Sequence, residues 1–335
     1  MESYEVRRVG IHRSVSGVIA CFLLFGVAMQ SSADAQVWPT KQVIRAIVPL
    51  TAGSATDVLA RVVFDQVSKQ IGQTIIIENR PGAAGTIGTA AVSKSEPDGY
   101  TILVNSSSHT VYPSTFAHPP FDVVADFSAI TPLANIPTVM VVAPSKGYQT
   151  LADFIAVAKA KPGSMTYGSG GIGNSTHLAA ERFRLAAGFE GLHVPFKGAP
   201  EALTEVMAGR VDFYFSPLPP AVPLIREGNL RALAVSSARR ASILPEVPTS
   251  KELGLQNSEY EFWVGVFVPS ATPRPIIERL YREIVSALEL PTVRAKLKEM
   301  GADPMPMAPQ EFDDYVKNEV KINTAVVKAA GIQPH

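Results

Sequence analysis

The amino-acid sequence predicts an α/β protein whose mostly parallel sheets are covered by helices on both faces. Short runs rich in Val, Ile, Leu and aromatic residues alternate with stretches whose apolar residues recur at helical spacing. This alternation is typical of βαβ units. The 335-residue chain shows no internal repeat and no low-complexity tail, which excludes solenoids and disordered linkers.

The predicted elements follow one another along the whole chain. Runs of β-favouring residues, most of them ended by Pro, Gly, Asn or Ser, predict strands at 43–48, 74–77, 101–104, 139–142, 165–167, 193–196, 211–215, 231–235 and 263–268. Amphipathic periodicity predicts helices at 58–70, 151–160, 178–187, 200–208 and 276–288.

The N-terminus has the three parts of an export signal. Arg7, Arg8 and Arg13 precede an uncharged apolar stretch at 15–29, and an A-x-A cleavage pattern ends at Ala35. A retained membrane anchor is the alternative, but the apolar stretch is shorter than the ~20 residues of a spanning helix. We expect residues 1–35 to be cleaved and the mature chain to lie in the periplasm.

Cysteine content and charge narrow the class of protein. Cys21 is the only cysteine; it lies inside the apolar stretch, and the weak lipobox around it predicts no lipidation. The mature chain then has no thiol, disulfide or cysteine metal ligand. The 30 basic and 30 acidic residues balance, also after cleavage, so no electrostatic footprint for nucleic acid is present. We expect a soluble monomer of two domains.

Two segments share one local design, in which a strand leads through small polar residues into a helix. They are residues 47–57 and 166–176. Such a loop places backbone N–H groups and the positive end of the helix dipole where an anion could bind. Helix capping alone is the alternative, because Ser54 with Asp57 fits a capping box and Asn174 or Ser175 fits an N-cap.

The second loop also matches a dinucleotide pattern, since Gly168, Gly170 and Gly173 have G-x-G-x-x-G spacing. A nucleotide site is not expected, because the next strand ends in Lys197 rather than an acidic residue and no P-loop lysine follows. The six histidines make no metal-binding spacing and no nucleophile elbow is present. We therefore predict no cofactor, no metal and no enzyme activity.

Several motifs in order resemble the Bug (Bordetella uptake gene) family, the extracytoplasmic receptors of tripartite tricarboxylate transporters. They are IIENRPGAAG at 76–85, PDGYTIL at 97–103, TYGS to HLAAE at 166–181, HVPFKG at 193–198, LRALAV at 230–235 and LPEVPT at 244–249.

The resemblance implies a type II periplasmic-binding-protein fold, a Venus flytrap of two α/β domains joined by two crossing strands. Domain 1 would comprise 36–138 and a C-terminal return at 238–335, and domain 2 would comprise 139–237. The crossings are expected near 139–143 and 231–236. Arg80, beside a Pro-Gly turn, is expected to make a structural ion pair or to anchor the turn.

In this fold the two polar loops face each other across one cleft and bind a carboxylate without a dedicated arginine. A third ligand-facing loop would be 105–109, and the end of the strand at 211–215 would reach the pocket. The predicted ligand-binding residues are Gly53, Ser54, Ala55, Thr56, Ser106, Ser107, Ser108, Gly170, Gly171, Asn174, Ser175, Thr176, His177, Phe215 and Ser216.

The predicted function is capture of a small organic acid, a di- or tricarboxylate or an aromatic acid, and its delivery to the membrane subunits of a tripartite tricarboxylate transporter. Where family members commonly have an aromatic residue in the first loop, this chain has Leu50, and Ser54 replaces a glycine. Two alternatives remain: an exported hydrolase with His177 or His109 as base, and a ligand-binding sensor subunit not engaged in transport.

Overall fold

The computed structural model describes residues 1–2 and 38–334. The predicted signal peptide, with Cys21 and the cleavage pattern, lies outside the described residues except for its first two positions. Among the residues described, no helix has both the length and the apolar character needed to cross a membrane.

A six-stranded sheet organises the first lobe of the molecule. Its strands run in the order β11-β4-β10-β3-β1-β2. β1 pairs in parallel with β2 and β3, whereas β10 is antiparallel to β3 and β4. The strands are β1 (Ile44–Val48), β2 (Ile75–Asn79), β3 (Thr101–Ser106), β4 (Phe127–Ile136), β10 (Phe262–Pro269) and β11 (Asp303–Pro304). This sheet is mixed, because the C-terminal strand β10 is inserted antiparallel at its centre.

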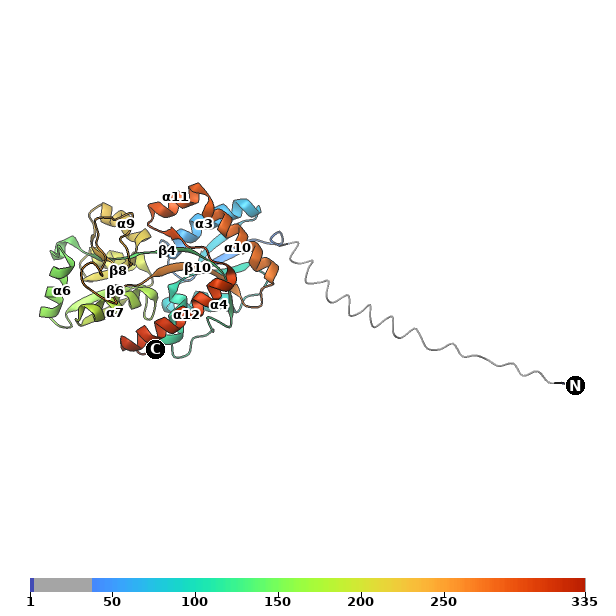
Figure 1. Cartoon of the computed structure of the whole chain (residues 1–335), viewed down its shortest axis with the longest axis horizontal. Helices are drawn as coiled ribbons and strands as arrows, with labels where there is room; N and C mark the ends of the chain where they lie inside the picture. The colour runs from blue at the N-terminus through green and yellow to red at the C-terminus, as the bar shows by residue number, and fades with distance from the viewer. Residues whose placement is uncertain (3–37, 335) are drawn as a thin grey trace.

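Helices on both faces bury this sheet, and Figure 1 shows α3 and α10 on one side of it and α12 on the other. The long helices are α3 (Ala55–Ile71), α4 (Thr86–Ser93), α10 (Arg274–Glu289), α11 (Pro291–Glu299) and α12 (Pro309–Ala329); the short ones are η1 (Ala83–Gly85), η2 (Ser107–Thr110) and α5 (Tyr112–Thr115). α10 has its apolar residues on one face, and Ile277, Leu280 and Ile284 are buried there.

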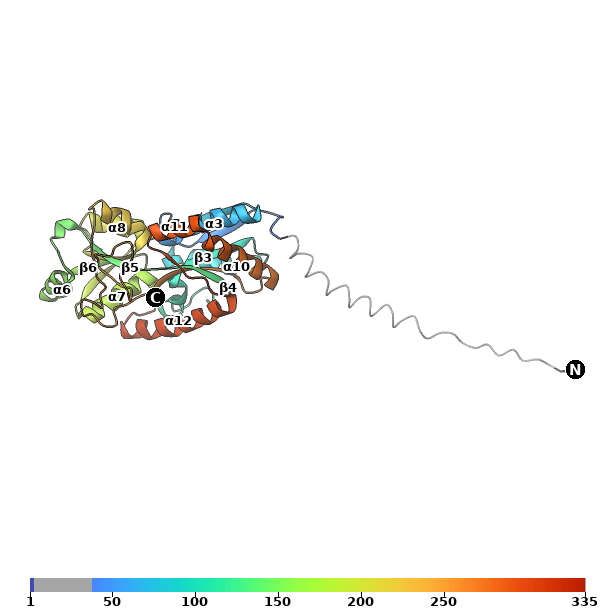
Figure 2. The ribbon, with the colours of Figure 1, turned by 45° about the horizontal axis from the view of Figure 1, so that its top comes forward.

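A five-stranded sheet organises the second lobe, in the order β7-β6-β8-β5-β9. Its strands are β5 (Thr138–Val142), β6 (Met165–Ser169), β7 (Gly191–Pro195), β8 (Phe213–Pro217) and β9 (Arg231–Val235), and its helices are η3 (Pro144–Lys146), α6 (Leu151–Ala160), α7 (Ser175–Ala187), α8 (Ala199–Met207) and α9 (Leu218–Arg226). Figures 1 and 2 show this lobe beside the first, with α6 at the outer end.

The chain passes between the lobes through two adjacent segments. Only Pro137 separates β4 from β5, and the return runs from Ser236 to β10. The two segments are tied together where the Thr138 and Ser236 hydroxyls lie 2.5 Å apart and Ser236 Oγ donates to Tyr260 O at 3.0 Å. The ranges expected to form the crossings, 139–143 and 231–236, are mostly strands of the second sheet.

All nine predicted strands and all five predicted helices are present, with ends that differ by a few residues. The strand β4 was not predicted, because Pro132 interrupts its run FSAITPLANI, although every residue but two of the ten is buried. The helix α9 was not predicted either, since its sequence LPPAVPLIR contains three prolines. Pro219 and Pro220 occupy the first turn, where a missing N–H leaves no hydrogen bond unmade.

Candidate functional site

A small cavity lies between the two lobes. Its volume is about 20 Å³, which is room for a single water molecule. Its lining comes from both lobes: Leu50, Ser54, Ala55, Thr56, Ser108 and Phe262 from the first, and Gly170, Asn174, Ser175, Thr176, Gly198, Ala199, Tyr214 and Pro217 from the second. None of these residues is charged. The lobes are therefore closed on each other, around a neutral space that is lined by both polar and apolar residues.

The first turn of α3 presents hydrogen-bond donors to this cavity. The Ser54 amide donates to Thr51 O, and the Asp57 amide donates to Ser54 Oγ at 3.3 Å. Because the amides of Ala55 and Thr56 lie in the same turn, they have no partner within the helix. The Thr56 hydroxyl is fully buried and also makes no hydrogen bond. An unpaired buried hydroxyl costs about 1–3 kcal/mol, and this one leaves an unused donor beside the cavity.

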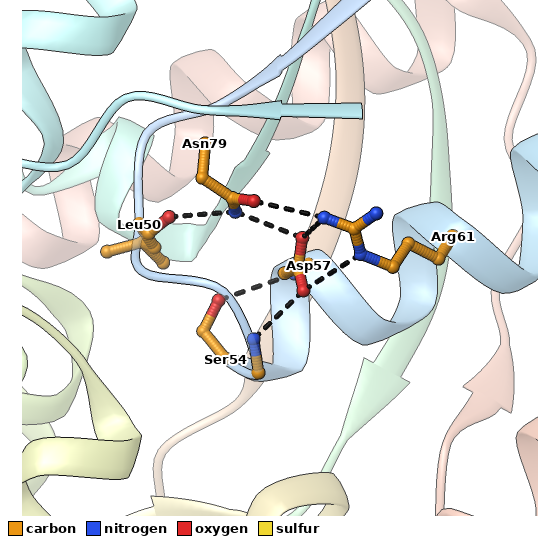
Figure 3. A network of polar contacts seen from close by, with 6 residues as sticks. Leu50, Ser54, Asp57, Arg61 and Asn79 are labelled. Atoms are coloured by element: carbon orange, nitrogen blue, oxygen red, sulfur yellow. Dashed lines mark hydrogen bonds and ion pairs between the residues drawn. The ribbon is translucent and has the colours of Figure 1, made fainter. Parts of the chain in front are cut away.

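The predicted Ser54–Asp57 capping box is only half formed. Ser54 Oγ caps the helix, but the Asp57 carboxylate accepts from the Gly53 amide at 2.9 Å instead of returning to Ser54. Figure 3 shows this carboxylate between Arg61 and Asn79, which both donate to it. Hydrogen bonds from these groups outweigh burial and hold the pKa of Asp57 below its usual value. The Gly53 amide is thus used inside the loop.

The loop before α7 satisfies most of its donors internally. Asn174 is the N-cap and its Oδ1 accepts from the His177 amide at 3.0 Å. The Gly170 amide donates to Thr176 Oγ1 at 2.8 Å, and the Gly173 amide donates to His177 Nδ1 at 3.1 Å. Of the amides in the first turn, Thr176 has no partner in the helix, and its residue lines the cavity. Capping and donation to the cavity are therefore combined here.

Two further helices begin at the cavity. Gly198 is the N-cap of α8 and Pro217 precedes the first residue of α9, and both residues line the cavity together with Ala199. Four helix N-termini thus converge on a space without a charged side chain. The helix dipoles place partial positive charge at the cavity, so the cavity favours an anion. The first turn of α9 adds no free N–H, because the Leu218 amide donates to Pro137 O and Pro219 and Pro220 have none. This contribution of α8 and α9 was not predicted, although Gly198 stood in the HVPFKG motif.

Apolar groups form the remaining wall of the cavity. Leu50 and Phe262 come from the first lobe and Tyr214 from the second. Tyr214 is buried, and burial raises the pKa of its phenol. The cavity therefore offers donors to a charged group and apolar surface to a carbon skeleton.

Direct contacts hold the two lobes together at the cavity. Ser108 Oγ of the first lobe accepts from the Ser175 amide of α7 and donates to its hydroxyl, both at 3.0 Å. Thr115 Oγ1 donates to Gly173 O at 3.1 Å. At Gly171, a Cβ atom would lie 2.9 Å from Cα of Ala84. The two backbones therefore approach so closely at the loop before α7 that only glycine fits at position 171.

Eight of the fifteen predicted ligand-binding residues line the cavity: Ser54, Ala55, Thr56, Ser108, Gly170, Asn174, Ser175 and Thr176. The other seven lie outside its lining. Ser106 and Ser107 belong to the buried chain of hydroxyls behind Ser108, and Ser106 Oγ donates to Ser108 Oγ at 3.0 Å. Gly53 and Gly171 shape the two loops.

The end of β8 was expected to reach the pocket, and its side chains point to two different faces of the sheet. Phe215 packs in an aromatic cluster with Phe183 and Phe213, and Ser216 Oγ donates to Pro217 O. The neighbouring Tyr214 faces the cavity instead. In a strand, alternate side chains point to opposite faces. Every residue of β8 is buried, so the sequence pattern does not tell which face packs in the core and which faces the cavity.

His109 and His177 are buried, and His193 is half-buried. His177 is stacked on His193 with ring centroids 3.8 Å apart, and Glu181, four residues further along α7, pairs with Arg184 and Tyr167. His193 Nε2 lies 2.6 Å from Ser169 Oγ, but that serine is fully buried and bonded to Gly171. Burial and the neighbouring His177 lower the pKa of His193 to about 3, and burial lowers that of His109 to about 4.

One predicted structural ion pair is present, because Arg80 pairs with Glu78. Across residues 1–2 and 38–334, no group of three or more His, Cys, Asp or Glu side chains could hold a metal ion.

The chain is similar to known receptors over nearly its whole length. The family described as the tripartite tricarboxylate transporter family receptor matches residues 59–332. Protein BugT of Bordetella pertussis is 34% identical over 308 residues, which is 91% of this chain and 94% of BugT. A protein of Pseudomonas sp. (strain P51), from the tcbD-tcbE intergenic region, is 36% identical over 276 residues and 82% of each chain.

Solved structures give the same result. The R. palustris protein Rpa4515 with adipate superposes with a TM-score of 0.86 at 32% identity, covering 89% of this chain and 100% of that one. The periplasmic binding protein BugD gives 0.85 at 27% identity, with 88% and 99% covered. MatC of Rhodopseudomonas palustris with bound malate gives 0.82 at 28% identity, with 86% and 99% covered. The chain therefore belongs to the family of tripartite tricarboxylate transporter receptors and has the two-domain periplasmic-binding-protein fold.

Proposed function

We propose that this protein is a periplasmic receptor that captures a small organic carboxylate between its lobes and delivers it to the membrane subunits of a tripartite tricarboxylate transporter. The observation that carries the proposal is the cavity where four helices begin and where the Thr56 hydroxyl is buried without a partner. A carboxylate oxygen would accept from the amides and hydroxyl of the α3 turn and from the Thr176 amide.

The ligand-bound relatives support this class of ligand, since one was solved with adipate and another with malate. In the flytrap model, the residues at 139–237 form the moving domain, and closure brings both sets of donors onto one ligand. The present cavity of about 20 Å³ is smaller than either acid, so binding requires the lobes to separate and to close again around the ligand.

The cavity also favours acids without an amino group. A buried ammonium group is best compensated by a carboxylate, and no lining residue supplies one. The carboxylate of Asp57, behind the α3 turn, is already saturated by four donors from Gly53, Arg61 and Asn79. We therefore infer that dicarboxylates and aromatic acids bind better than the corresponding amino acids.

Two other functions, a hydrolase and a sensor subunit, are weighed against transport. Members of this family are solute receptors and not enzymes, so the hydrolase alternative is set aside, and His109 and His177 are buried supports. A sensor subunit would use the same cavity, and pull-down of the transporter's membrane subunits with ligand-loaded protein separates it from a transport receptor.

The test is a thermal-shift screen followed by calorimetry with malate, adipate, citrate and benzoate. Their methyl esters and aspartate serve as matched controls. We expect at least one acid to stabilise the protein, by about 2.7 kcal/mol at a hundredfold excess over its Kd, and the ester to have no effect. If no acid raises the Tm while a nucleotide or an ester does, the proposed function is wrong.

A further inference from the structure

Asp57 is a buried carboxylate next to the cavity that the proposed binding does not use. It is 2% exposed and does not line the cavity. Its Oδ2 accepts from the Gly53 amide at 2.9 Å and from Arg61 Nε at 3.1 Å. Its Oδ1 accepts from Arg61 Nη2 at 2.9 Å and from Asn79 Nδ2 at 3.0 Å. Four donors on one buried carboxylate are more than a helix cap requires.

These bonds join three separate parts of the first lobe, as Figure 3 shows. Asn79 lies at the end of β2, and its Nδ2 also donates to Leu50 O at 3.0 Å. Arg61 lies one turn further along α3, and its Nη2 also reaches Asn79 Oδ1 at 3.0 Å. The loop between Leu50 and Ser54 is therefore fixed at both ends by one network, which we call the Asp57 brace.

The brace sets the position of groups that line the cavity. Leu50, whose carbonyl it holds, contributes to the apolar wall. Gly53, whose amide it holds, has a left-handed φ of 80° that places Ser54 as the N-cap. The amides of Ala55 and Thr56 follow directly. A shift of the loop would therefore displace every donor of this turn.

The brace also controls charge beside an anion site. A lone carboxylate in the first turn of α3 would oppose a bound anion, although it is favourable to the helix itself. The two bonds from Arg61 make a bidentate ion pair with Asp57. The pair is neutral as a whole, so the positive end of the helix dipole remains available to the ligand.

We propose that Asp57, Arg61 and Asn79 are positioning residues for ligand binding: they fix the loop before α3 and neutralise the one carboxylate beside it. This rests on the proposed function for the part that concerns affinity. The alternative is that the brace only stabilises the first lobe. The two differ in whether the loop, and the affinity for anions, change when the lobe as a whole does not.

The first experiment needs no ligand and measures amide hydrogen exchange by NMR in Asp57→Asn and Arg61→Met. In Asp57→Asn, the amide side chain has only one acceptor oxygen and cannot satisfy the donors on both sides. Arg61 is half exposed, so its replacement by Met is easily accommodated. We expect exchange of the backbone amides at positions 53, 54 and 57 to rise about tenfold or more in both variants. Asp65→Asn, which removes the exposed Lys69 ion pair of the same helix, is the matched control and should leave these amides unchanged.

The second experiment measures the Kd of adipate and malate by calorimetry for Arg61→Met, Arg61→Lys and Asp65→Asn. We expect Arg61→Met to weaken binding about tenfold or more, with malate and adipate both affected, and Arg61→Lys to restore most of the affinity because it restores the charge. Asp65→Asn should bind as the parent does.

The outcomes separate the two proposals. If the parent binds neither acid nor any other carboxylate, the proposed function fails, and the exchange rates alone decide whether the brace holds the loop. If the loop amides exchange at parental rates, or if exchange rises equally over the whole first lobe, the brace does not position the loop. Equal Kd values for parent and Arg61→Met would overturn its role in binding.

Discussion

The loop that leads into α3 is held by charged side chains, whereas the loop that leads into α7 is held by neutral ones. Before α3, the carboxylate of Asp57 and the guanidinium of Arg61 fix the backbone. Before α7, the Thr176 hydroxyl and the His177 ring accept the loop amides. The first segment keeps buried hydroxyls without a partner, at Thr51 and Thr56, and the described residues 166–176 keep none. The same strand-loop-helix design therefore yields a loop before α3 that is rich in free donors and a loop before α7 whose donors are mostly bonded within the loop.

The largest effect is expected from Gly173→Ala, in the loop before α7, and it concerns closure of the two lobes. Gly173 has a φ of 74°, and its Cβ would lie 2.5 Å from Cβ of Thr115 in the other lobe. The variant should fail to close, so that small-angle scattering shows no compaction when adipate is added. Gly163→Ala has the same backbone strain, with φ 73° and no atom within 4 Å, and should close normally. A Gly173→Ala protein that compacts like the parent would contradict the closed arrangement.

The free donors of the α3 turn are tested by Thr56→Val, which removes the hydroxyl and keeps the shape of the side chain. Since Oγ1 is buried and unpaired without ligand, the free energy of unfolding should stay the same or rise by about 1 kcal/mol. Affinity for the bound acid should fall by about 1.5–3 kcal/mol, because a hydrogen bond to a charged group is lost. Chemical denaturation and calorimetry measure the two quantities. A variant that is less stable and binds equally well would show that Thr56 is a structural residue.

Acid should lower the stability of each lobe through a histidine whose pKa is lowered by burial. The pKa of His109, in the first lobe, is lowered to about 4, so between pH 6.5 and 4 the unfolded state binds a proton that the folded state does not. Stability therefore falls with falling pH over that window, by up to ~1.4 kcal/mol per pH unit for one group. His193 acts in the same direction in the second lobe, with a pKa near 3. Urea titrations of His109→Gln across this range should show a flatter slope than the parent.

The smallest effects concern the two helix caps. Ser54 Oγ accepts one long bond of 3.3 Å, whereas Asn174 Oδ1 accepts from both the His177 amide and the Thr176 hydroxyl at 3.0 Å. Replacement of a cap by Ala costs about 1 kcal/mol, and Asn174→Ala should therefore be more destabilising than Ser54→Ala. Thermal denaturation gives both values. The reverse order would mean that the single long bond to Ser54 contributes more to stability than the two bonds to Asn174 do.

The sequence alone supports much of the fold and about half of the cavity. Strands and helices with clean periodicity were predicted, and so were the two loops, because small polar residues after a strand have a direct physical meaning. β4 was missed because Pro132 breaks its pattern, although the antiparallel ladder with β10 tolerates it through a register shift at Gly265.

The missing cavity residues share one property: only tertiary structure brings them there. Phe262 arrives from the C-terminal return, and Gly198 and Pro217 arrive because α8 and α9 begin at the same edge of the second sheet. Which loop groups are already used also depends on long-range partners, since Asn79 Nδ2 donates to the Leu50 carbonyl of the first loop and the Ser175 amide donates to Ser108 Oγ of the other lobe. Residue types predict that donors exist, and packing decides which of them remain free.

The central claim is that the α3 turn binds a carboxylate group of the ligand, with help from α7. The most direct measurement is a crystal structure of the protein with the acid that gives the largest thermal shift. We expect a carboxylate oxygen about 3 Å from Thr56 Oγ1 and from the Ala55 or Thr56 amide, with no cationic side chain in contact. A carboxylate bound instead by an arginine or lysine, or an acid bound outside the cavity between the lobes, would contradict this account.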